Sequence, residues 1–437
     1  MADDQKPIVV GYAMKPEREK GFLKRNALPA QPIQGICFKK IDLSAPLGPQ
    51  LAEVDLVLHR MMDELQSVDW DQEEKQAEPQ AAPANNLAPV HDLGPRETDG
   101  APYKKQSETA NIAEQVSCSQ RGSERPAHEA GNLSGPGVSG RSDGVASTHR
   151  TKRCFQMSAG HLELERFCAS HPELLVVDSF DDVRVVMDRF AIHDAISNIT
   201  LPGLAVTVRA PKAIRVLEHD VAKLSESMAE LGMAFPCIMK PRVACGTPES
   251  HAMALLLRPE GLLESRVTLP ASLQEYVDHG GLQHKVYVLG SKLFHTPRVS
   301  MPDAREILDE HREAAVVTFD SLRTPLTRSA NPTADSDGAT CEPTQSNGVD
   351  EAALEGIASW LREKLGLSLF GFDVVVQLDS RDHIVVDVNY FPSFKDVPKE
   401  IAVTSLWDAL RHKHEQWCLL NQEDGDVKAD YEDGSFC

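Results

Sequence analysis

An α/β fold is the architecture that the sequence predicts, and three observations support it. Short runs rich in β-branched residues lie at residues 8–12, 36–41 and 54–59, and helix-compatible stretches separate them. Two apolar runs around a polar turn, within residues 370–392, are typical of a β-hairpin. The chain has 437 residues, which suggests two or three domains with a sizeable core.

The other predicted elements follow the same patterns from residue 157 onward. Apolar residues at helical spacing predict helices at 162–168, 182–196 and 351–365, and Gly366 follows the last of them as a C-cap glycine. Apolar, β-branched runs predict strands at 174–177, 236–240, 269–277, 285–289, 370–378 and 383–388.

Three segments have a composition that disfavours a packed core. Residues 72–156 are rich in Pro, Ala, Ser, Gly, Asn and Gln and almost lack aromatic residues, so we expect a disordered low-complexity insert. Residues 322–348 predict a second loop insert. Residues 421–437 predict an acidic, solvated tail.

The charge and the cysteines exclude several classes of function. A net charge of −21 argues against a nucleic-acid-binding face and against a polybasic membrane patch. There is no run of about 18 apolar residues, and the acidic N-terminus lacks a secretory pattern. We therefore expect a cytoplasmic monomer, with a nuclear location as the alternative. Nine scattered cysteines without a CxxC pair indicate reduced thiols rather than a zinc site.

Three oxygen-bearing side chains mark the predicted hairpin. Asp373 lies near the start of the first strand, and Asp387 and Asn389 lie near the end of the second. If the loop has an odd number of residues, Asp373 pairs across from Asp387 and Asn389 shares that face, whereas an even loop splits the faces. Opposed carboxylates destabilise a sheet unless a cation joins them, and hard oxygen ligands suit Mg²⁺ beside ATP phosphates. The alternative is an ordinary hairpin with polar ends.

Other motifs have both a functional and a structural interpretation. Lys240 ends an apolar strand and can reach a phosphate, or it is a surface lysine. The loop around Gly246 can line phosphates with backbone N–H groups, but it has no Walker A or GxGxxG sequence and a plain turn also explains it. Gln274, Glu275 and Val277 fit either a hinge that meets an adenine edge or one more buried strand.

Two further polar residues stand out near these motifs. Lys285 alternates with Tyr287 against apolar neighbours, so its side chain points off the core face. It suits a phosphate ligand or a solvated lysine. His251 either contacts a phosphate or caps a helix.

Nine blocks of sequence occur in a specific order along both folded regions. They are VGYAM (10–14), DLVLHR (55–60), HPELLVVD (171–178), MDRF (187–190), MKPRVACGTPESHAMAL (239–255), LQEYVDHGGLQHKVYVLG (273–290), RVSMPD (298–303), LFGFDVV (369–375) and VVDVNYFPSF (385–394). In these blocks the chain resembles the inositol-tetrakisphosphate 1-kinase family, also called inositol 1,3,4-trisphosphate 5/6-kinases. Only the two inserts and the tail fall outside the resemblance.

The resemblance implies an ATP-grasp fold, in which an N-terminal α/β domain adjoins two lobes that clasp ATP. It places this domain at residues 1–71, completed by about 157–185, with a central lobe at 186–277 and a C-terminal lobe at 278–420. It also implies an ATP- and Mg²⁺-dependent kinase that transfers the γ-phosphate to an inositol tris- or tetrakisphosphate.

The resemblance further implies roles for single residues. It makes Lys240 and Asp373 catalytic, with Asp373 as the candidate general base. The metal set is Asp373, Asp387 and Asn389, which agrees with the pairing argument above. The ATP-binding set is Arg189, Lys240, Gln274, Glu275, Val277 and Ser300, and the substrate-binding set is Arg18, His251, Lys285, Asn389 and Ser393.

Three positions depart from the family pattern. Arg18 stands where the family usually has a lysine, which changes the geometry of a phosphate contact. Ser393 replaces a frequent glycine that lies against substrate, and Cys245 replaces a histidine of some members. Two other functions therefore stay open: an ATP-grasp carboxylate–amine ligase, and an inactive module that binds inositol phosphate.

Overall fold

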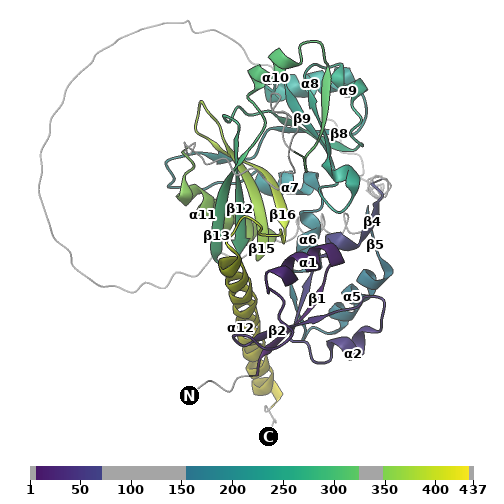
Figure 1. Cartoon of the computed structure of the whole chain (residues 1–437), viewed down its shortest axis with the longest axis vertical. Coiled ribbons are helices and arrows are strands. Elements are labelled where there is room, and N and C mark those ends of the chain that lie inside the picture. The colour runs from purple at the N-terminus through teal and green to yellow at the C-terminus, as the bar shows by residue number, and fades with distance from the viewer. Residues whose placement is uncertain (1–5, 71–153, 324–347, 433–437) are drawn as a thin grey trace, which may run out of the picture.

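The computed structural model describes residues 6–70, 154–323 and 348–432, with the side chains of the last helix described through residue 421. The predicted insert at 72–156 and the predicted loop at 322–348 lie almost wholly outside these residues. The strands of the described residues form three sheets and one two-stranded ladder. In Figure 1 the central sheet lies at the top, the C-terminal sheet below it and the N-terminal sheet at the bottom.

The N-terminal sheet is parallel, with strand order β2-β1-β3-β6. Its strands are short and aliphatic because helices cover a parallel sheet on its faces. The predicted strands at 8–12, 36–41, 54–59 and 174–177 are confirmed. The elements of this part are β1 (Ile8–Ala13), α1 (Pro16–Lys24), β2 (Ile36–Lys40), α2 (Leu47–Leu51), β3 (Leu56–His59), η1 (Met61–Glu64), α5 (Ala159–Ser170) and β6 (Leu175–Val177).

A two-stranded antiparallel ladder stands beside the N-terminal sheet. It joins β4 (Leu65–Val68) to β5 (Phe155–Met157), and Val68 pairs with Phe155. The sequence did not predict these strands, since both are very short. The described residues 70 and 154, on either side of the gap, are therefore close together.

The helix predicted at 182–196 is wrong as one element, because the structure has two. α6 (Phe180–Val185) ends before Asp188, and α7 (Arg189–Ile196) begins after it. Asp188 has an extended backbone that forms an isolated bridge with Val243, and its carboxylate accepts a hydrogen bond from the Phe190 amide at 2.9 Å. This long-range bridge and N-cap interrupt a helical pattern that is locally continuous.

The central sheet is built from antiparallel pairs, with strand order β14-β10-β9-β11-β8. Its strands β9 and β11 confirm the predictions at 236–240 and 269–277, although β11 is shorter. The last strand, β14, comes from within the predicted C-terminal lobe. The elements are β8 (Ala213–Val216), α8 (Val221–Leu231), β9 (Cys237–Pro241), η2 (Pro248–His251), β10 (Ala252–Leu256), α9 (Gly261–Glu264), β11 (Ala271–Glu275), α10 (Ala304–Glu310) and β14 (Val316–Asp320).

The C-terminal sheet has strand order β13-β12-β15-β16-β7. The hairpin and the helix predicted at 351–365 are confirmed, with Asp350 as N-cap and Gly366 in the left-handed conformation beyond the helix. The expected tail begins as a helix, since α12 runs through Glu432. The elements are β7 (Val208–Arg209), β12 (Leu282–Leu289), β13 (Lys292–Val299), α11 (Glu351–Leu365), β15 (Leu369–Val376), β16 (His383–Tyr390) and α12 (Lys399–Glu432).

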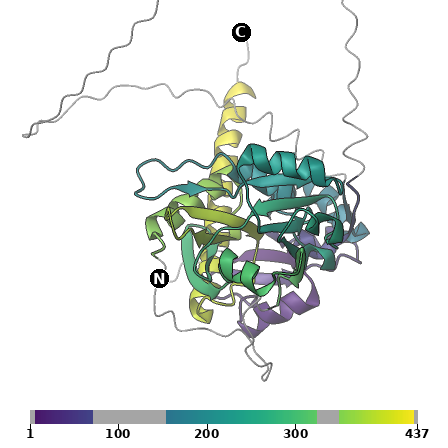
Figure 2. The same cartoon turned by 90° about the horizontal axis from the view of Figure 1, so that it is seen from above.

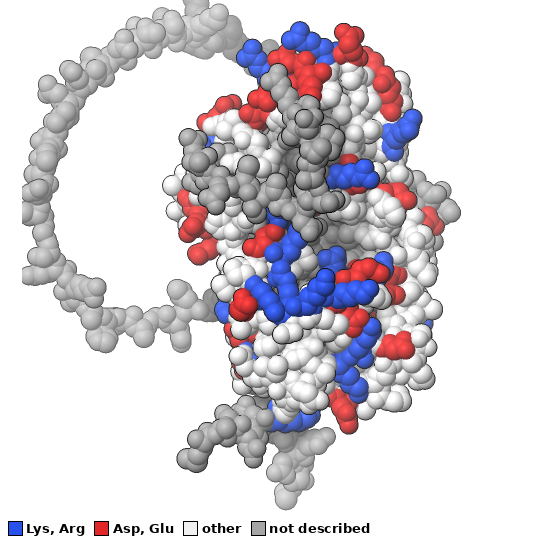
Figure 3. All heavy atoms as spheres, in the orientation of Figure 1, with Lys and Arg blue, Asp and Glu red and all other residues white. Residues whose placement is uncertain are grey.

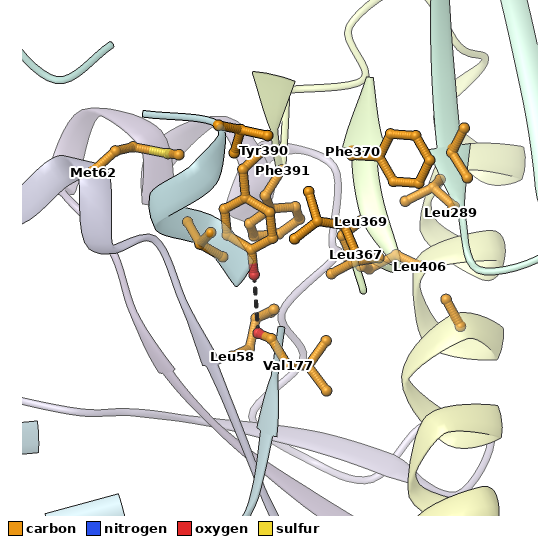
Figure 4. Packing of buried hydrophobic residues seen from close by; sticks show 14 of the residues in the cluster. Leu58, Met62, Val177, Leu289, Leu367, Leu369, Phe370, Tyr390, Phe391 and Leu406 are labelled. Atoms are coloured by element: carbon orange, nitrogen blue, oxygen red, sulfur yellow. Dashed lines mark hydrogen bonds between the residues drawn. The ribbon is translucent and has the colours of Figure 1, made fainter. Parts of the chain in front are cut away.

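One hydrophobic core joins the N-terminal part to the C-terminal sheet, whereas the central sheet has cores of its own. In Figure 4 the hydroxyl of Tyr390, at the end of β16, donates a hydrogen bond to the carbonyl of Val177 on β6 at 3.0 Å. The close-up also shows Leu58 of β3 and Leu406 of α12 among this packing. Figure 2 shows the far end of α12 extending past the rest of the described chain. None of the described helices is both long and apolar enough to cross a membrane.

Candidate active site

The register of the hairpin places the two predicted carboxylates directly opposite each other. Asp373 on β15 pairs with Asp387 on β16, and Asn389 lies two residues further along the same strand. The loop between the paired Val376 and His383 has six residues, 377–382, so the assumption of an odd loop is wrong. The pairing still holds because the register shifts between Asp373 and Val374.

The register shift is a β-bulge with Val386 as its extra residue. Val374 pairs with Val385 and the preceding residue, Asp373, pairs with Asp387. Val386 therefore has no partner on β15. The bulge moves Asp387 and Asn389 onto the face that carries Asp373. Asn389 Nδ2 donates to Asp387 Oδ2 at 3.2 Å, which keeps both groups together.

One member of the acid pair, Asp373, is buried and incompletely paired, whereas Asp387 is half-buried. Asp373 is only 7% exposed, and its Oδ1 has no hydrogen-bond partner among the described residues. Burial raises the pKa of Asp373 to about 6, the charge of Asp387 adds to the rise, and Lys285 opposes it. Lys285 Nζ lies 3.8 Å from Asp373 Oδ1. A buried carboxylate oxygen without a partner beside a second carboxylate is suited to a cation.

The donor set fits Mg²⁺ better than a softer metal. It consists of two carboxylates and one carboxamide, which are hard oxygen ligands. The described residues hold no cluster of three or more His, Cys, Asp or Glu side chains arranged for a metal ion. Asp373, Asp387 and Asn389 would therefore hold Mg²⁺ together with oxygens from water or phosphate, as is usual for this ion.

Lys240 reaches the acid pair from the central sheet. It lies in β9, is 8% exposed, and donates from Nζ to the carbonyl of Val386 at 3.0 Å. Burial lowers the pKa of Lys240 to about 8, and Asp387 opposes this shift. The surface-lysine interpretation is thus excluded, and the bulge supplies the carbonyl that receives the ammonium group.

Arg189 lies beneath the glycine loop. Its guanidinium donates to the carbonyls of Pro241 at 2.6 Å, Val243 at 2.7 Å and Ser250 at 3.1 Å, and only 5% of the residue is exposed. The side chain predicted to contact nucleotide therefore fixes the backbone of this loop in the structure. Gly246 closes the loop at φ +88°, and a Cβ there would lie 2.8 Å from the carbonyl oxygen of Met62.

The predicted hinge connects the central and C-terminal sheets. Gln274 and Glu275 end β11, and Val277 packs in a small apolar cluster with Val375 and Ile384 of the hairpin. The Glu275 carboxylate is engaged within the protein, because it pairs with Arg209 and accepts from the amide of Lys212 at 2.8 Å. Ser300 follows β13 and donates its amide to the carbonyl of Gly281 at 2.8 Å, at the other end of the hinge segment.

The cationic side of the site comes from the N-terminal part. Burial lowers the pKa of Arg18 on α1, and the charge of the neighbouring Arg60 adds to the effect. Arg60 is buried, pairs with Asp63 at 3.3 Å and donates to the carbonyl of Phe391, two residues beyond Asn389. Figure 3 shows Lys and Arg side chains gathered in a band across the middle of this face, over α1.

Sequence reasoning missed Arg60, although a signal was present. It follows β3 at the carboxyl edge of a parallel sheet, where binding residues commonly lie. His251 ends η2, and its Nδ1 lies 3.1 Å from the hydroxyl of Ser321; burial and the charge of Arg189 lower its pKa. Ser393 is half-buried in the segment between β16 and α12. The charge of Asp387 opposes the lowering of the His251 pKa, so His251 lies within electrostatic reach of the acid pair.

The chain is similar to known proteins over most of its length. The family profile described as the inositol 1,3,4-trisphosphate 5/6-kinase ATP-grasp domain matches residues 205–408. Inositol-tetrakisphosphate 1-kinase 6 of Oryza sativa subsp. indica is 32% identical over 95% of this chain and 62% of its own length. Inositol-tetrakisphosphate 1-kinase 5 of Oryza sativa subsp. japonica is 34% identical over 61% of this chain and 78% of its own length.

The chain thus spans about three fifths of the first of these rice relatives, 62%. Among solved structures, the macrocyclase MdnC bound with precursor peptide MdnA from Microcystis aeruginosa MRC is 12% identical, covers 93% of this chain and 100% of that chain, and has a TM-score of 0.45. Likeness at this level says nothing about activity. The residues matched by the family profile include every predicted site residue except Arg18 and Arg189.

Proposed function

Because this chain belongs to the inositol 1,3,4-trisphosphate 5/6-kinase family, with its ATP-grasp fold, we propose that it transfers the γ-phosphoryl group of ATP to a hydroxyl of an inositol tris- or tetrakisphosphate. One observation supports this most directly: Asp373 and Asp387 are paired opposite each other, and Lys240 reaches the bulge between them. Oxygen ligands and a buried cation at one point are what phosphoryl transfer requires.

The hairpin arranges three chemical environments along its length. Nearest the loop is the apolar cluster of Val277, Val375 and Ile384, which suits an adenine ring. Asp373 lies two residues from Val375, or about 7 Å along the strand, and this is where phosphates belong. Beyond it, Arg60 donates to the carbonyl of Phe391 past the end of β16, and Arg18 neighbours Arg60, so a polyanionic acceptor fits there.

The reaction proposed is an in-line displacement. The acceptor hydroxyl oxygen forms a bond to the γ-phosphorus, the bond from that phosphorus to the β-phosphate oxygen breaks, and the hydroxyl proton is released. Bound Mg²⁺ would neutralise charge on the phosphate oxygens. Lys240, already desolvated, stabilises the transferring group without reorganisation. Arg18, Arg60 and Lys285 position the acceptor by its phosphates.

The test is a product analysis. The full chain is incubated with Mg·ATP and a panel of inositol tris- and tetrakisphosphates, and the inositol phosphates and ADP are separated and quantified. We expect one more phosphate on the inositol ring for each ADP formed. ADP formation that requires both a carboxylate and an amine would overturn the proposal in favour of a ligase. Binding of inositol phosphate without ATP turnover would overturn it in favour of a binding module.

A further inference from the structure

Arg209 joins three segments that meet at the hinge. It is the last residue of β7, on the edge of the C-terminal sheet. Its guanidinium pairs with the carboxylate of Glu275, on the central sheet. It also donates to Gln377 Oε1 at 2.9 Å and lies 3.4 Å from Asp382 Oδ2, both in the hairpin loop. One planar, rigid donor group therefore fastens the central sheet to the hairpin that carries the acid pair.

A second fastening lies at the other end of the same hinge segment. The amide of Leu378 in the hairpin loop donates to the carbonyl of Asp278 at 3.0 Å. Asp278 Oδ1 in turn accepts from the amide of Ala304 at 2.6 Å. The segment from Glu275 to Asp278 is thus held to residues 377–382 at both ends. Val277 lies between the two attachments and contributes to the apolar cluster.

The Glu275 carboxylate has its partners inside the protein. Besides Arg209 it accepts the amide of Lys212 at 2.8 Å, and the Glu275 amide donates back to the carbonyl of Lys212 at 2.9 Å. Its position therefore sets the hinge backbone rather than presenting a charge to a ligand. The charged hydrogen bond from Arg209 and the amide of Lys212 meet at the same oxygen, Oε1, and a charge-assisted contact holds a carboxylate more strongly than a neutral one does.

We propose that Arg209 is a positioning residue for the nucleotide, which fixes the hinge segment at a set distance from Asp373 and Asp387. This inference rests on the proposed function only in placing ATP along the hairpin. Loss of Arg209 removes the attachment at the Glu275 end of the hinge and leaves the Leu378–Asp278 hydrogen bond alone, so the distance between the adenine contact and the phosphate contact is less strictly fixed. We therefore expect lower affinity for the nucleotide and unchanged affinity for the inositol phosphate acceptor.

The experiment measures nucleotide binding and turnover separately. The full chain and the variants Arg209→Gln and Arg209→Lys are titrated with Mg·AMPPNP by calorimetry, and kcat and both KM values are measured for turnover. We expect Arg209→Gln to weaken AMPPNP binding about tenfold, a coupling in the usual range for contacting charged groups. The KM for inositol phosphate and kcat should stay within about threefold, with partial rescue in Arg209→Lys because it keeps one charge.

A double-mutant cycle identifies the contact that is responsible. Glu275→Gln should weaken AMPPNP binding similarly, and the double variant should lose little more than either single variant, because both remove one contact. The matched control is Arg215→Gln, which breaks an exposed pair between β8 of the central sheet and Asp194 of α7 at 2.5 Å and should leave AMPPNP affinity unchanged.

Three results would overturn the inference: unchanged AMPPNP affinity in Arg209→Gln, an equal rise in the KM for inositol phosphate, or additive losses in the double variant. Failure of the wild-type chain to bind AMPPNP would overturn it as well. If AMPPNP binds with the expected dependence on Arg209 but inositol phosphates are never phosphorylated, the proposed function fails and the inference stands.

Discussion

At the scale of single residues, Asp373 and Asp387 stand directly opposite each other on neighbouring strands. Two like charges in this position oppose sheet pairing, and neither Lys285, at 3.8 Å, nor Lys240 forms a close ion pair with Asp373. The pair is therefore better suited to ligand binding than to stability. Replacing Asp387 therefore tests its contribution to turnover separately from its contribution to stability.

Asp387→Ala should lower kcat by roughly 10²–10³-fold or more, the scale of losing one preorganised electrostatic contact to the transition state. The melting temperature should not fall, because the substitution removes a like-charge contact. Steady-state kinetics and thermal unfolding check both statements. Asp379→Ala is the matched control, since Asp379 is an exposed carboxylate in the loop of the same hairpin. Near-normal turnover in Asp387→Ala would rule out this residue as a metal ligand.

His59 shows how burial sets a protonation state. It is 1% exposed, its Nε2 donates to the carbonyl of Asp178 at 2.6 Å, and its Nδ1 accepts the amide of Met61 at 3.3 Å. Both ring nitrogens are satisfied only in the neutral form. Burial lowers the pKa of His59 to about 3.

The low pKa of His59 makes stability depend on pH. The unfolded state takes up the proton near pH 6.5 and the folded state only near 3, so this stability is complete above about 6.5 and is lost as pH falls toward 3. The loss between pH 6.5 and 4 should be about 3 kcal/mol. Urea unfolding at several pH values measures it. His59→Gln should flatten the slope in this window and the exposed His412→Gln should not; equal slopes in all three proteins would contradict the assignment.

At the scale of elements, the bulge at Val386 determines which side chains meet. The six-residue loop by itself places Asp387 on the face opposite Asp373, and one extra residue in β16 reverses this. Val386 also offers its carbonyl to Lys240. A single inserted residue thus links the hairpin to the central sheet and aligns the acid pair.

Deleting Val386 should restore a regular ladder that keeps Asp387 opposite Asp373, because Val374–Val385 and Asp373–Asp387 are the pairs on either side of the bulge. The deletion removes the carbonyl that receives Lys240 Nζ, so turnover should fall roughly tenfold to a hundredfold while circular dichroism stays native. Deleting Ser380 from the loop is the control, because it shortens the turn without changing register beyond the bulge. Retained activity after deletion of Val386 would show that the bulge carbonyl is not needed to position Lys240.

Local patterns predicted the strands and helices whose apolar periodicity is uninterrupted. The hairpin, the N-terminal strands and the helix ending before Gly366 belong to this group. The break at Asp188 was not predictable, because its cause is a bridge to Val243 far along the chain. The short strands β8, β10 and β14 were missed because each is recognisable only by its partners in the central sheet.

The candidate site was predictable where side chains alternate along one strand and unpredictable where a contact crosses elements. The opposition of Asp373 and Asp387 was predicted on the assumption of an odd loop, but the loop has six residues and the pairing depends on the bulge at Val386, which the sequence did not predict. Arg209 and Arg60 were missed, since their partners are 66 and 331 residues away in sequence. Spacing alone could not indicate either contact.

At the scale of the whole molecule, two parts that are distant in sequence share a core. Trp407 of α12 donates to the carbonyl of Ala27 at 2.8 Å, and Arg25 donates to the carbonyl of Phe394 at 2.9 Å. Asp178 accepts the amide of Ser368 at 2.7 Å. The central sheet takes no part in this core and packs on its own residues, among them Met228.

Trp407→Ala should therefore destabilise the N-terminal part and the C-terminal sheet together, by about 3–5 kcal/mol. Hydrogen exchange followed by mass spectrometry should show faster exchange in peptides from both β1 and β15, with β9 unaffected. Met228→Ala should give the reverse pattern, because this side chain is buried in the central sheet's core. Faster exchange of β15 alone in Trp407→Ala would mean that the two parts are not one cooperative unit.

The ladder of β4 and β5 has a consequence for how such a chain can vary. Asp69 donates its amide to the carbonyl of Cys154 at 2.9 Å, so two residues that are 85 positions apart in sequence are neighbours in the structure. An insertion between these two ends costs little stability, since each doubling of a loop's length adds only about 0.6 kcal/mol of closure entropy. This point lies beside the glycine loop, because the guanidinium carbon of Arg242 is 3.9 Å from the centre of the Trp70 ring. A change of length at this point would therefore lie next to the glycine loop of the candidate site.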